Sequence, residues 1–173
     1  MNRWWSEVGT TLAAEFSDIA DASELTVICT RLLMAALLGG LLGFEREHSG
    51  KAAGIRTHML VCMGAALFVL IPSQVDGGSG EIGRVIQGIA AGIGFIGAGT
   101  ILKGAGEENQ VRGLTTAAGL WLTAAIGVAV GIGLEATALL STLLALLILN
   151  VVPRVAMGLI GKKDKKDQKD ERE

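Results

Sequence analysis

The chain alternates between long apolar stretches and short polar connections, and five of the apolar stretches have roughly the length of a membrane span. They cover about residues 25–44, 57–72, 84–102, 114–132 and 134–153. A helix needs about 17–25 mostly apolar residues to cross the hydrocarbon core of a bilayer. The stretches are continuous rather than alternating, which favours helices over the strands of a barrel. The sequence therefore predicts an all-α, polytopic membrane protein with about five transmembrane helices.

The composition supports a membrane protein and excludes two other classes. Half of the 173 residues are apolar before the 25 glycines are counted, and 18% are charged. A disordered chain needs low hydrophobicity and high charge, and a soluble domain carries about 25% charged residues. The two cysteines, Cys29 and Cys62, lie within apolar stretches. This placement predicts two buried thiols rather than a disulfide framework.

Polar segments flank the predicted transmembrane domain of residues 25–153. Residues 1–24 carry apolar side chains at three- and four-residue spacing. This spacing predicts an amphipathic helix on the outer membrane surface, with a frayed polar leader as the alternative. Residues 154–173 mix both charge signs and end without apolar side chains. They predict a solvated, disordered cytoplasmic tail.

The basic residues predict which way the chain faces. If the N-terminus lies outside, the outer side carries Arg3 and Arg84. The cytoplasmic side then carries the larger set of Arg46, Lys51, Arg56, Lys103, Arg112, Arg154 and the bases of the tail. Because cytoplasmic loops are enriched in lysine and arginine, the sequence predicts an outer N-terminus and a cytoplasmic C-terminus.

Small residues recur four positions apart within three of the predicted spans. The stripes are Ala35, Gly39 and Gly43; Gly88 and Gly92 with Ala90, Gly94 and Ala98; and Gly119, Thr123, Gly127 and Gly131. Such stripes let helix backbones approach closely in a membrane, and they would also permit a homo-oligomer. The third span has small residues on several faces, which predicts a central position in the bundle. A broken or pore-lining helix over residues 92–99 is the functional alternative.

The connection between the first two spans is the densest polar stretch outside the tail. Glu45 and Glu47 flank Arg46 at the end of an apolar helix, with histidines nearby. Two carboxylates in this setting could hold a hydrated Mg²⁺ ion. The alternatives are an ion-pair network with Arg56 and Arg112, or a surface on which another protein docks.

Two further predictions concern charged and hydroxyl side chains at the ends of the spans. Arg31 and Glu135 lie at the same predicted depth near the outer side. They could form an ion pair, or the arginine could extend towards the membrane surface by itself. Thr115 and Thr116 begin the fourth span, where a hydroxyl group can cap the helix N-terminus.

The sequence predicts that the protein is not an enzyme. It contains no supported Ser–His–Asp arrangement, no C-x-x-C pair, no phosphate-binding loop and no H-E-x-x-H motif. A nucleophile beside a base, which covalent catalysis requires, is not apparent either.

Four stretches in one order resemble the MgtC/SapB family of membrane proteins. They read RLLMAALLGGLLGFERE at residues 31–47, AGIRTHMLVCMGAAL at 53–67, RVIQGIAAGIGFIGAGTIL at 84–102 and VRGLTTAAGLWLTAAIG at 111–127. The resemblance implies a multi-pass protein of the bacterial inner membrane with its N-terminus outside. It also implies the short form of the family, because a charged tail stands where many longer members carry a soluble domain.

The resemblance also implies a role in magnesium homeostasis, in adaptation to low magnesium or acid, and in survival inside host cells. At least some members are thought to restrain the F-type ATP synthase. We therefore expect a regulatory or accessory protein that binds a partner in the lipid bilayer, with a transporter or channel for Mg²⁺ or another small ion as the alternative. A nucleic-acid partner is not expected. The motif positions that carry over are Arg31, Glu45, Arg46, Glu47, Arg56, Thr57, His58, Arg84, Gln87, Arg112, Thr115 and Thr116.

Overall fold

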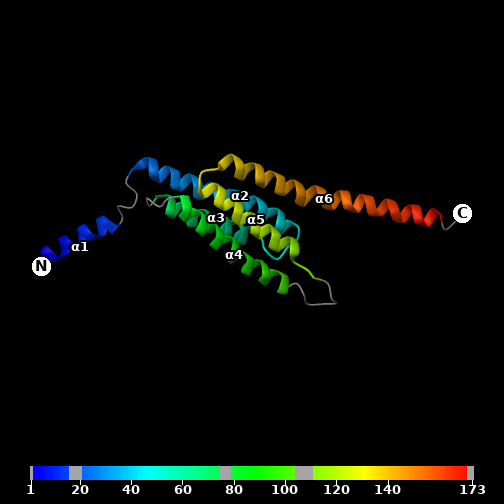
Figure 1. The fold of residues 1–173 in the computed structure, drawn as a ribbon, viewed down its shortest axis with the longest axis horizontal. Helices are drawn as coiled ribbons and strands as arrows, with labels where there is room; N and C mark the ends of the chain where they lie inside the picture. The colour runs from blue at the N-terminus through cyan, green and yellow to red at the C-terminus, as the bar shows by residue number, and fades with distance from the viewer. Residues whose placement is uncertain (1, 16–20, 75–78, 104–110, 171–173) are drawn as a thin grey trace.

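The computed structural model is a bundle of helices joined by short connections (Figure 1). It describes the backbone of residues 2–15, 21–74, 79–103 and 111–170, and the side chains of residues 3–15, 21–73, 80–101 and 111–155. The helices are α1 Asn2–Glu15, α2 Ala22–His48, α3 Ile55–Gln74, α4 Ser79–Lys103, α5 Leu114–Gly131 and α6 Glu135–Asp170. The described residues form no strand, so the predicted all-α class is confirmed.

Five of these helices are long and apolar enough to cross a membrane. The spans are Ala22–His48, Ile55–Ser73, Gly80–Ile101, Leu114–Gly131 and Glu135–Val155. Each coincides, to within a few residues at either end, with one of the five apolar stretches of the sequence, so the predicted spans are confirmed. One side of the bundle holds the C-terminal ends of α2, α4 and α6 together with the N-terminal ends of α3 and α5 (Figure 1).

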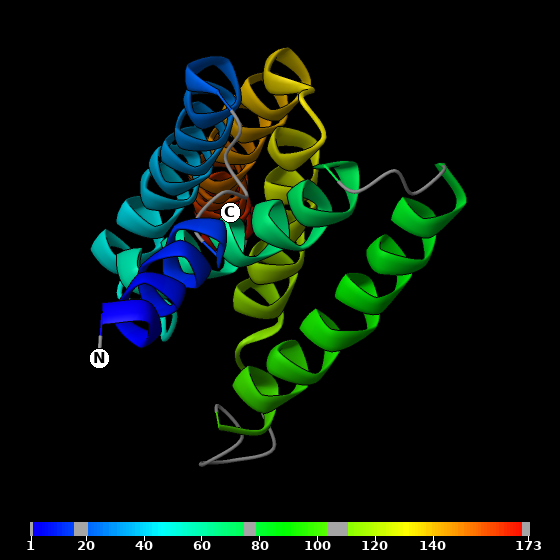
Figure 2. The same ribbon diagram turned by 90° about the vertical axis from the view of Figure 1, so that its left-hand side faces the viewer.

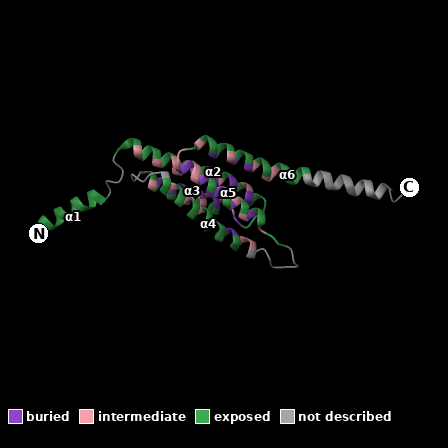
Figure 3. Ribbon diagram, in the orientation of Figure 1, coloured by how far each residue is buried: buried purple, intermediate pink, exposed green. Residues whose placement is uncertain are grey.

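The core lies where α2, α3 and α5 pack against one another, with α6 against α2 and α5 (Figure 3). Leu38, Cys62, Ile126 and Val130 are at most 3% exposed and share one apolar cluster. Many large apolar side chains point outward instead, as expected of a protein whose surface faces lipid. The buried Cys62 agrees with the sequence prediction, whereas Cys29 lies on the exposed face of α2.

Glycines on α2 and α5 allow backbones to come into direct contact with α3. A Cβ atom at Gly39 would lie 2.6 Å from the carbonyl oxygen of His58, and one at Gly43 would lie 2.6 Å from the Cα atom of Ile55. On α5, a Cβ atom at Gly127 would overlap the carbonyl group of Cys62. The small-residue stripes predicted on these two helices therefore do serve close packing.

The prediction that the third span is central is wrong, because α4 lies on the flank of the bundle beside α5 and α3 (Figure 2). Of the five spans, α5 buries the largest share of its residues and α4 the smallest. A Cβ atom at Gly88, Gly92 or Gly94 would meet no atom within 4 Å. Small residues on several faces permit close contact but do not create it, because each contact also needs a facing backbone.

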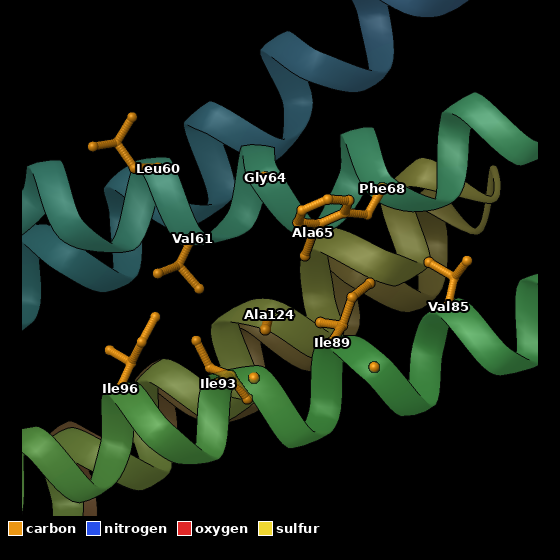
Figure 4. Close-up of a pocket in the computed structure, with 12 residues that line it drawn as sticks. Leu60, Val61, Gly64, Ala65, Phe68, Val85, Ile89, Ile93, Ile96 and Ala124 are labelled. Atoms are coloured by element: carbon orange, nitrogen blue, oxygen red, sulfur yellow. The ribbon is translucent and has the colours of Figure 1, made fainter.

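The flanking position of α4 leaves an apolar groove of about 610 Å³ between it and α3 (Figure 4). Leu60 and Phe68 of α3 stand on one side, and Val85, Ile89 and Ile96 of α4 stand on the other. The groove is lined by aliphatic and aromatic side chains and by glycines, so its lining contains no polar or charged side chain.

Helices occur at both ends of the described chain, as expected for the N-terminal end but not for the C-terminal end. The predicted amphipathic segment forms α1, and its described side chains are almost all exposed. The helix α6 continues to Asp170, whereas a disordered segment was expected from residue 154. The lysines and the glutamine of residues 162–169 have good helix propensity, and they continue a helix already formed by the apolar span.

Asp21 caps α2, and this contact gives the first testable prediction. Its carboxylate accepts hydrogen bonds from the backbone N–H of Glu24 at 2.8 Å and from the hydroxyl group of Ser23 at 2.7 Å. These bonds hold the pKa of Asp21 below its usual range. Asp21→Ala should lower the unfolding temperature of the protein, whereas Asp21→Asn, which keeps an acceptor, should largely preserve it.

The pH dependence of the unfolding temperature tests the role of the Asp21 carboxylate. Because the pKa is lowered in the folded chain, the stabilisation by Asp21 is complete above the pKa of the unfolded chain. It disappears as the pH falls through the lower folded pKa. Unfolding temperatures of the parent protein and of Asp21→Ala should therefore converge as the pH is lowered from neutral through the acidic range. A gap of constant size over this range would contradict the role of the carboxylate.

Candidate functional site at one end of the bundle

Polar side chains converge where α2 ends, α5 begins and α6 leaves the span. They surround a cavity of about 470 Å³. Its polar lining comes from four parts of the chain: Glu45 and Arg46 of α2, Ser49 and Lys51 of the following turn, Thr115 of α5, and Asn150 and Arg154 of α6. We call this space the polar cavity. It joins residues that are more than a hundred positions apart in the sequence.

A buried ion pair forms the inner wall of the polar cavity. The Nε atom of Arg46 donates a hydrogen bond to the Glu45 carboxylate, and only 4% and 10% of the two side chains is exposed. The other carboxylate oxygen of Glu45 accepts a hydrogen bond from the hydroxyl group of Ser49 at 2.9 Å. A charge buried to this extent is costly unless it is paired, so Arg46 and Glu45 hold each other in place.

Behind Arg46 lies a smaller chamber of about 190 Å³, here called the inner chamber. It shares Arg46 and Thr115 with the polar cavity and adds His58. The Nδ1 atom of His58 lies 3.0 Å from the carbonyl oxygen of Gly54. Its Nε2 atom is buried and has no hydrogen-bond partner among the described residues. Gly119 faces it, since a Cβ atom there would lie 3.8 Å from Nε2.

The first turn of α5 opens toward the same end of the bundle. Its N-cap residue is Gly113, and no side chain of the described residues caps the helix. The prediction that Thr115 or Thr116 would provide the cap is therefore wrong: Thr115 lines both cavities, and Thr116 is buried. Gly113 has φ = +90°, and a Cβ atom there would lie 2.7 Å from the carbonyl oxygen of Thr100. Only glycine fits this close approach to α4 without strain.

Glu47 does not face the polar cavity. Its Oε2 atom accepts a hydrogen bond at 2.9 Å from the backbone N–H of Ile55, the first residue of α3. Glu45 and Glu47 therefore engage different partners, although they are two residues apart. The described residues contain no group of three or more histidine, cysteine, aspartate or glutamate side chains arranged to hold a metal ion. Binding of Mg²⁺ by Glu45 and Glu47 stays a prediction.

The remaining predicted site residues lie apart from the polar cavity. Arg56 and Thr57 are exposed on α3, Arg112 is exposed before α5, and none of the three forms an ion pair with a described residue. Arg84 and Gln87 are exposed near the beginning of α4, at the opposite end of the bundle.

Arg31 also lies at the opposite end, where it fixes α2 to the turn between α5 and α6. Its Nη1 atom donates a hydrogen bond at 2.9 Å to the carbonyl oxygen of Gly131. Its Nε atom lies 3.9 Å from the Glu135 carboxylate, so the ion pair considered from the sequence does form. A Cβ atom at Gly133 would lie 2.6 Å from Nη2 of Arg31, and Gly133 has φ = +87°. This arrangement indicates a structural role for Arg31.

Sequence reasoning missed several residues of the polar cavity. Ser49, Lys51, Asn150 and Arg154 were not among the predicted site residues, although all four line it. Asn150 gave a signal, because it is a single amide in an otherwise apolar run. The pattern could not show that this face of α6 turns toward the end of α2.

A comparison with protein-family models gives one match, to the MgtC family over residues 32–157. This match covers most of the chain, including the greater part of the first span and the whole of the other four. The chain belongs to the MgtC family. Curated members include the protein SrpB of Synechococcus elongatus, which is 45% identical over 130 residues, covering 69% of this chain and 71% of SrpB.

Two longer members of the MgtC family extend the comparison. The protein MgtC of Brucella abortus is 52% identical over 108 residues, which cover 62% of this chain and 44% of that protein. The Escherichia coli K12 protein named "Putative magnesium transporter YhiD" is 37% identical over 139 residues, covering 76% of this chain and 63% of that protein. The comparison with solved structures gives no match to this chain.

Proposed function

We propose that this protein acts in magnesium homeostasis as a regulatory or accessory protein of the bacterial inner membrane, and that the polar cavity is its functional site. Membership of the MgtC family supports a link to magnesium, as does the printed name of the relative YhiD. The excess of basic residues on the side of the polar cavity supports a cytoplasmic position for it.

The observation that carries the proposal is the contrast between a charged cavity at one end and a tightly packed core behind it. Leu38, Leu120, Ile126 and Val130 fill the middle of the bundle and are at most 3% exposed. The buried hydroxyl group of Thr123 donates its hydrogen bond to the carbonyl oxygen of Gly119 within its own helix. A cavity that opens at one end and stops at a close-packed core suits the binding of a ligand or partner better than conduction.

A transporter of Mg²⁺ or another small cation is the second candidate. The observation that favours it is the Glu45 carboxylate, which lines the polar cavity. Against it, the Glu45 charge is already paired with Arg46, and Lys51 and Arg154 would repel a cation. Ion flux distinguishes the two functions.

Growth at low magnesium tests the proposal in a strain that lacks the gene. The parent chain should restore growth, whereas Lys51→Gln and Arg154→Gln should not, because both change the polar cavity. Arg3→Gln removes an exposed charge from α1 and should restore growth like the parent. Immunoblots of membranes should find all variants at similar levels. Restoration by both cavity variants would contradict the assignment of the site.

Reconstitution in liposomes tests the second candidate. The purified protein should pass no more Mg²⁺ than empty liposomes do. If the parent instead passes more Mg²⁺ than empty liposomes and Glu45→Gln abolishes this flux, the result would support a transporter and contradict the accessory function. By the family resemblance, the F-type ATP synthase is the first partner to test. If it is the partner, removing it should abolish the effect of the protein on growth at low magnesium.

A further inference from the structure

The polar cavity carries more positive than negative charge. The Glu45 carboxylate is matched by Arg46, which donates to it directly. Lys51 and Arg154 line the same cavity and form no ion pair with another described residue. The described lining therefore has an excess of two positive charges, which suits an anionic ligand.

The beginning of α5 adds to this positive potential. The helix is 18 residues long, and among the described residues no side chain accepts a hydrogen bond from its first N–H groups. Thr115, its second residue, lines the polar cavity with its neighbours from α2 and α6. The free N–H groups and the dipole of a helix N-terminus attract phosphate and other anions.

His58 provides an independent sign that a polar ligand belongs here. It is 1% exposed, and its unpartnered Nε2 atom lies in the inner chamber, which shares Arg46 and Thr115 with the polar cavity. A buried nitrogen without a hydrogen-bond partner is costly. A ligand oxygen or a water molecule that entered with the ligand would satisfy it.

The side of the polar cavity formed by α6 indicates that the ligand also has an apolar part. Ile148 and Val152 line the polar cavity and are 59% and 56% exposed, so an apolar surface continues from the cavity along the outside of the span. Arg154 lies at the end of the same span, Glu135–Val155, where lipid headgroups are expected. A free phosphate ion would leave this apolar surface in contact with water or lipid, whereas a phospholipid would cover it with an acyl chain.

We propose that the polar cavity binds the phosphate headgroup of an anionic phospholipid, held by Lys51, Arg154 and the N-terminus of α5. Basic pockets between transmembrane helices on the cytoplasmic side bind anionic headgroups by the same chemistry. The acyl chains lie against Ile148 and Val152. This inference rests on the proposed function in that it names a ligand for the same cavity.

Lipid binding to the purified full-length protein tests the proposal. In native mass spectrometry, the parent should retain phosphatidylglycerol in preference to phosphatidylcholine. The double variant Lys51→Gln/Arg154→Gln should lose affinity for phosphatidylglycerol on the order of fivefold for each charge removed. Two controls should keep the preference: Lys51→Arg/Arg154→Lys, which conserves the charge, and Arg3→Gln, which removes a distant one.

The possible outcomes distinguish a lipid site from a site for a free anion, and both from the proposed function. Equal retention of phosphatidylglycerol by the parent and the Lys51→Gln/Arg154→Gln variant would overturn it. If instead the parent and this double variant differ only in their binding of inorganic phosphate, the site takes a free anion and the lipid assignment is wrong. The lipid binding measured by mass spectrometry does not depend on whether the protein supports growth at low magnesium. A protein that binds the lipid but fails to restore growth would therefore contradict the proposed function and leave the lipid site intact.

Discussion

Gly127→Ala is expected to destabilise the protein by at least about 1–3 kcal/mol, the usual cost of overpacking a core. The added methyl group would overlap the carbonyl group of Cys62, which is backbone of α3 and has no flexible end to move aside. The two helices could separate only by giving up the packing of Ile126 and Val130, which lie in the same cluster. Unfolding in one detergent, followed by circular dichroism, measures the effect.

Gly88→Ala on α4 is the matched control. A Cβ atom there meets nothing within 4 Å, so the same substitution should leave the stability unchanged or raise it slightly. Alanine has a helix propensity about 1 kcal/mol better than glycine, and this gain applies to both variants. Equal stabilities of the two variants would contradict the close contact between α3 and α5.

Arg46→Met is expected to cost about 3–5 kcal/mol, because it leaves the buried Glu45 carboxylate without its cation. The arginine side chain is 4% exposed and the glutamate side chain 10% exposed, so water cannot replace the lost partner well. Methionine keeps much of the apolar contact of the arginine stem. Arg46→Lys keeps the charge and should cost less.

A double-mutant cycle isolates the ion pair from the rest of the packing. Glu45→Gln removes the charge that Arg46→Met would strand, so the double variant should be more stable than the sum of the single effects allows. The coupling should also decline at low pH, where the carboxylate becomes protonated. Additive effects within about 0.5 kcal/mol would show that Arg46 and Glu45 do not depend on each other.

The sequence alone determined the number of spans and the character of their contacts. Because a bilayer requires about 20 apolar residues for each helix, the five stretches gave the five spans directly. The stripes with Gly39 on α2 and Gly127 on α5 correctly predicted where backbones touch. The ion pair between Arg31 and Glu135 was also predictable, since two charges at one depth in a membrane have few other partners.

The tertiary structure alone decided how each helix is rotated and which neighbours it has. The glycines of α4 looked like those of a central helix, yet a Cβ atom at most of them would meet no neighbouring atom, because packing needs a complementary surface as well as a small residue. Glu45 and Glu47 looked like one carboxylate pair, yet one faces the polar cavity and the other the start of α3. Positions two apart on a helix point in different directions, which separates them.

The composition of the polar cavity shows the same division. Arg46 and Thr115 were predictable from polar residues at helix ends, where charged groups avoid the apolar part of the bilayer. Asn150 and Arg154 joined them only because α6 packs against α2 and α5 with this face inward. The pattern of residues along one helix predicts how deep that helix lies in the membrane and which of its faces are apolar. The meeting of side chains from distant helices depends on packing angles that no single stretch of sequence contains.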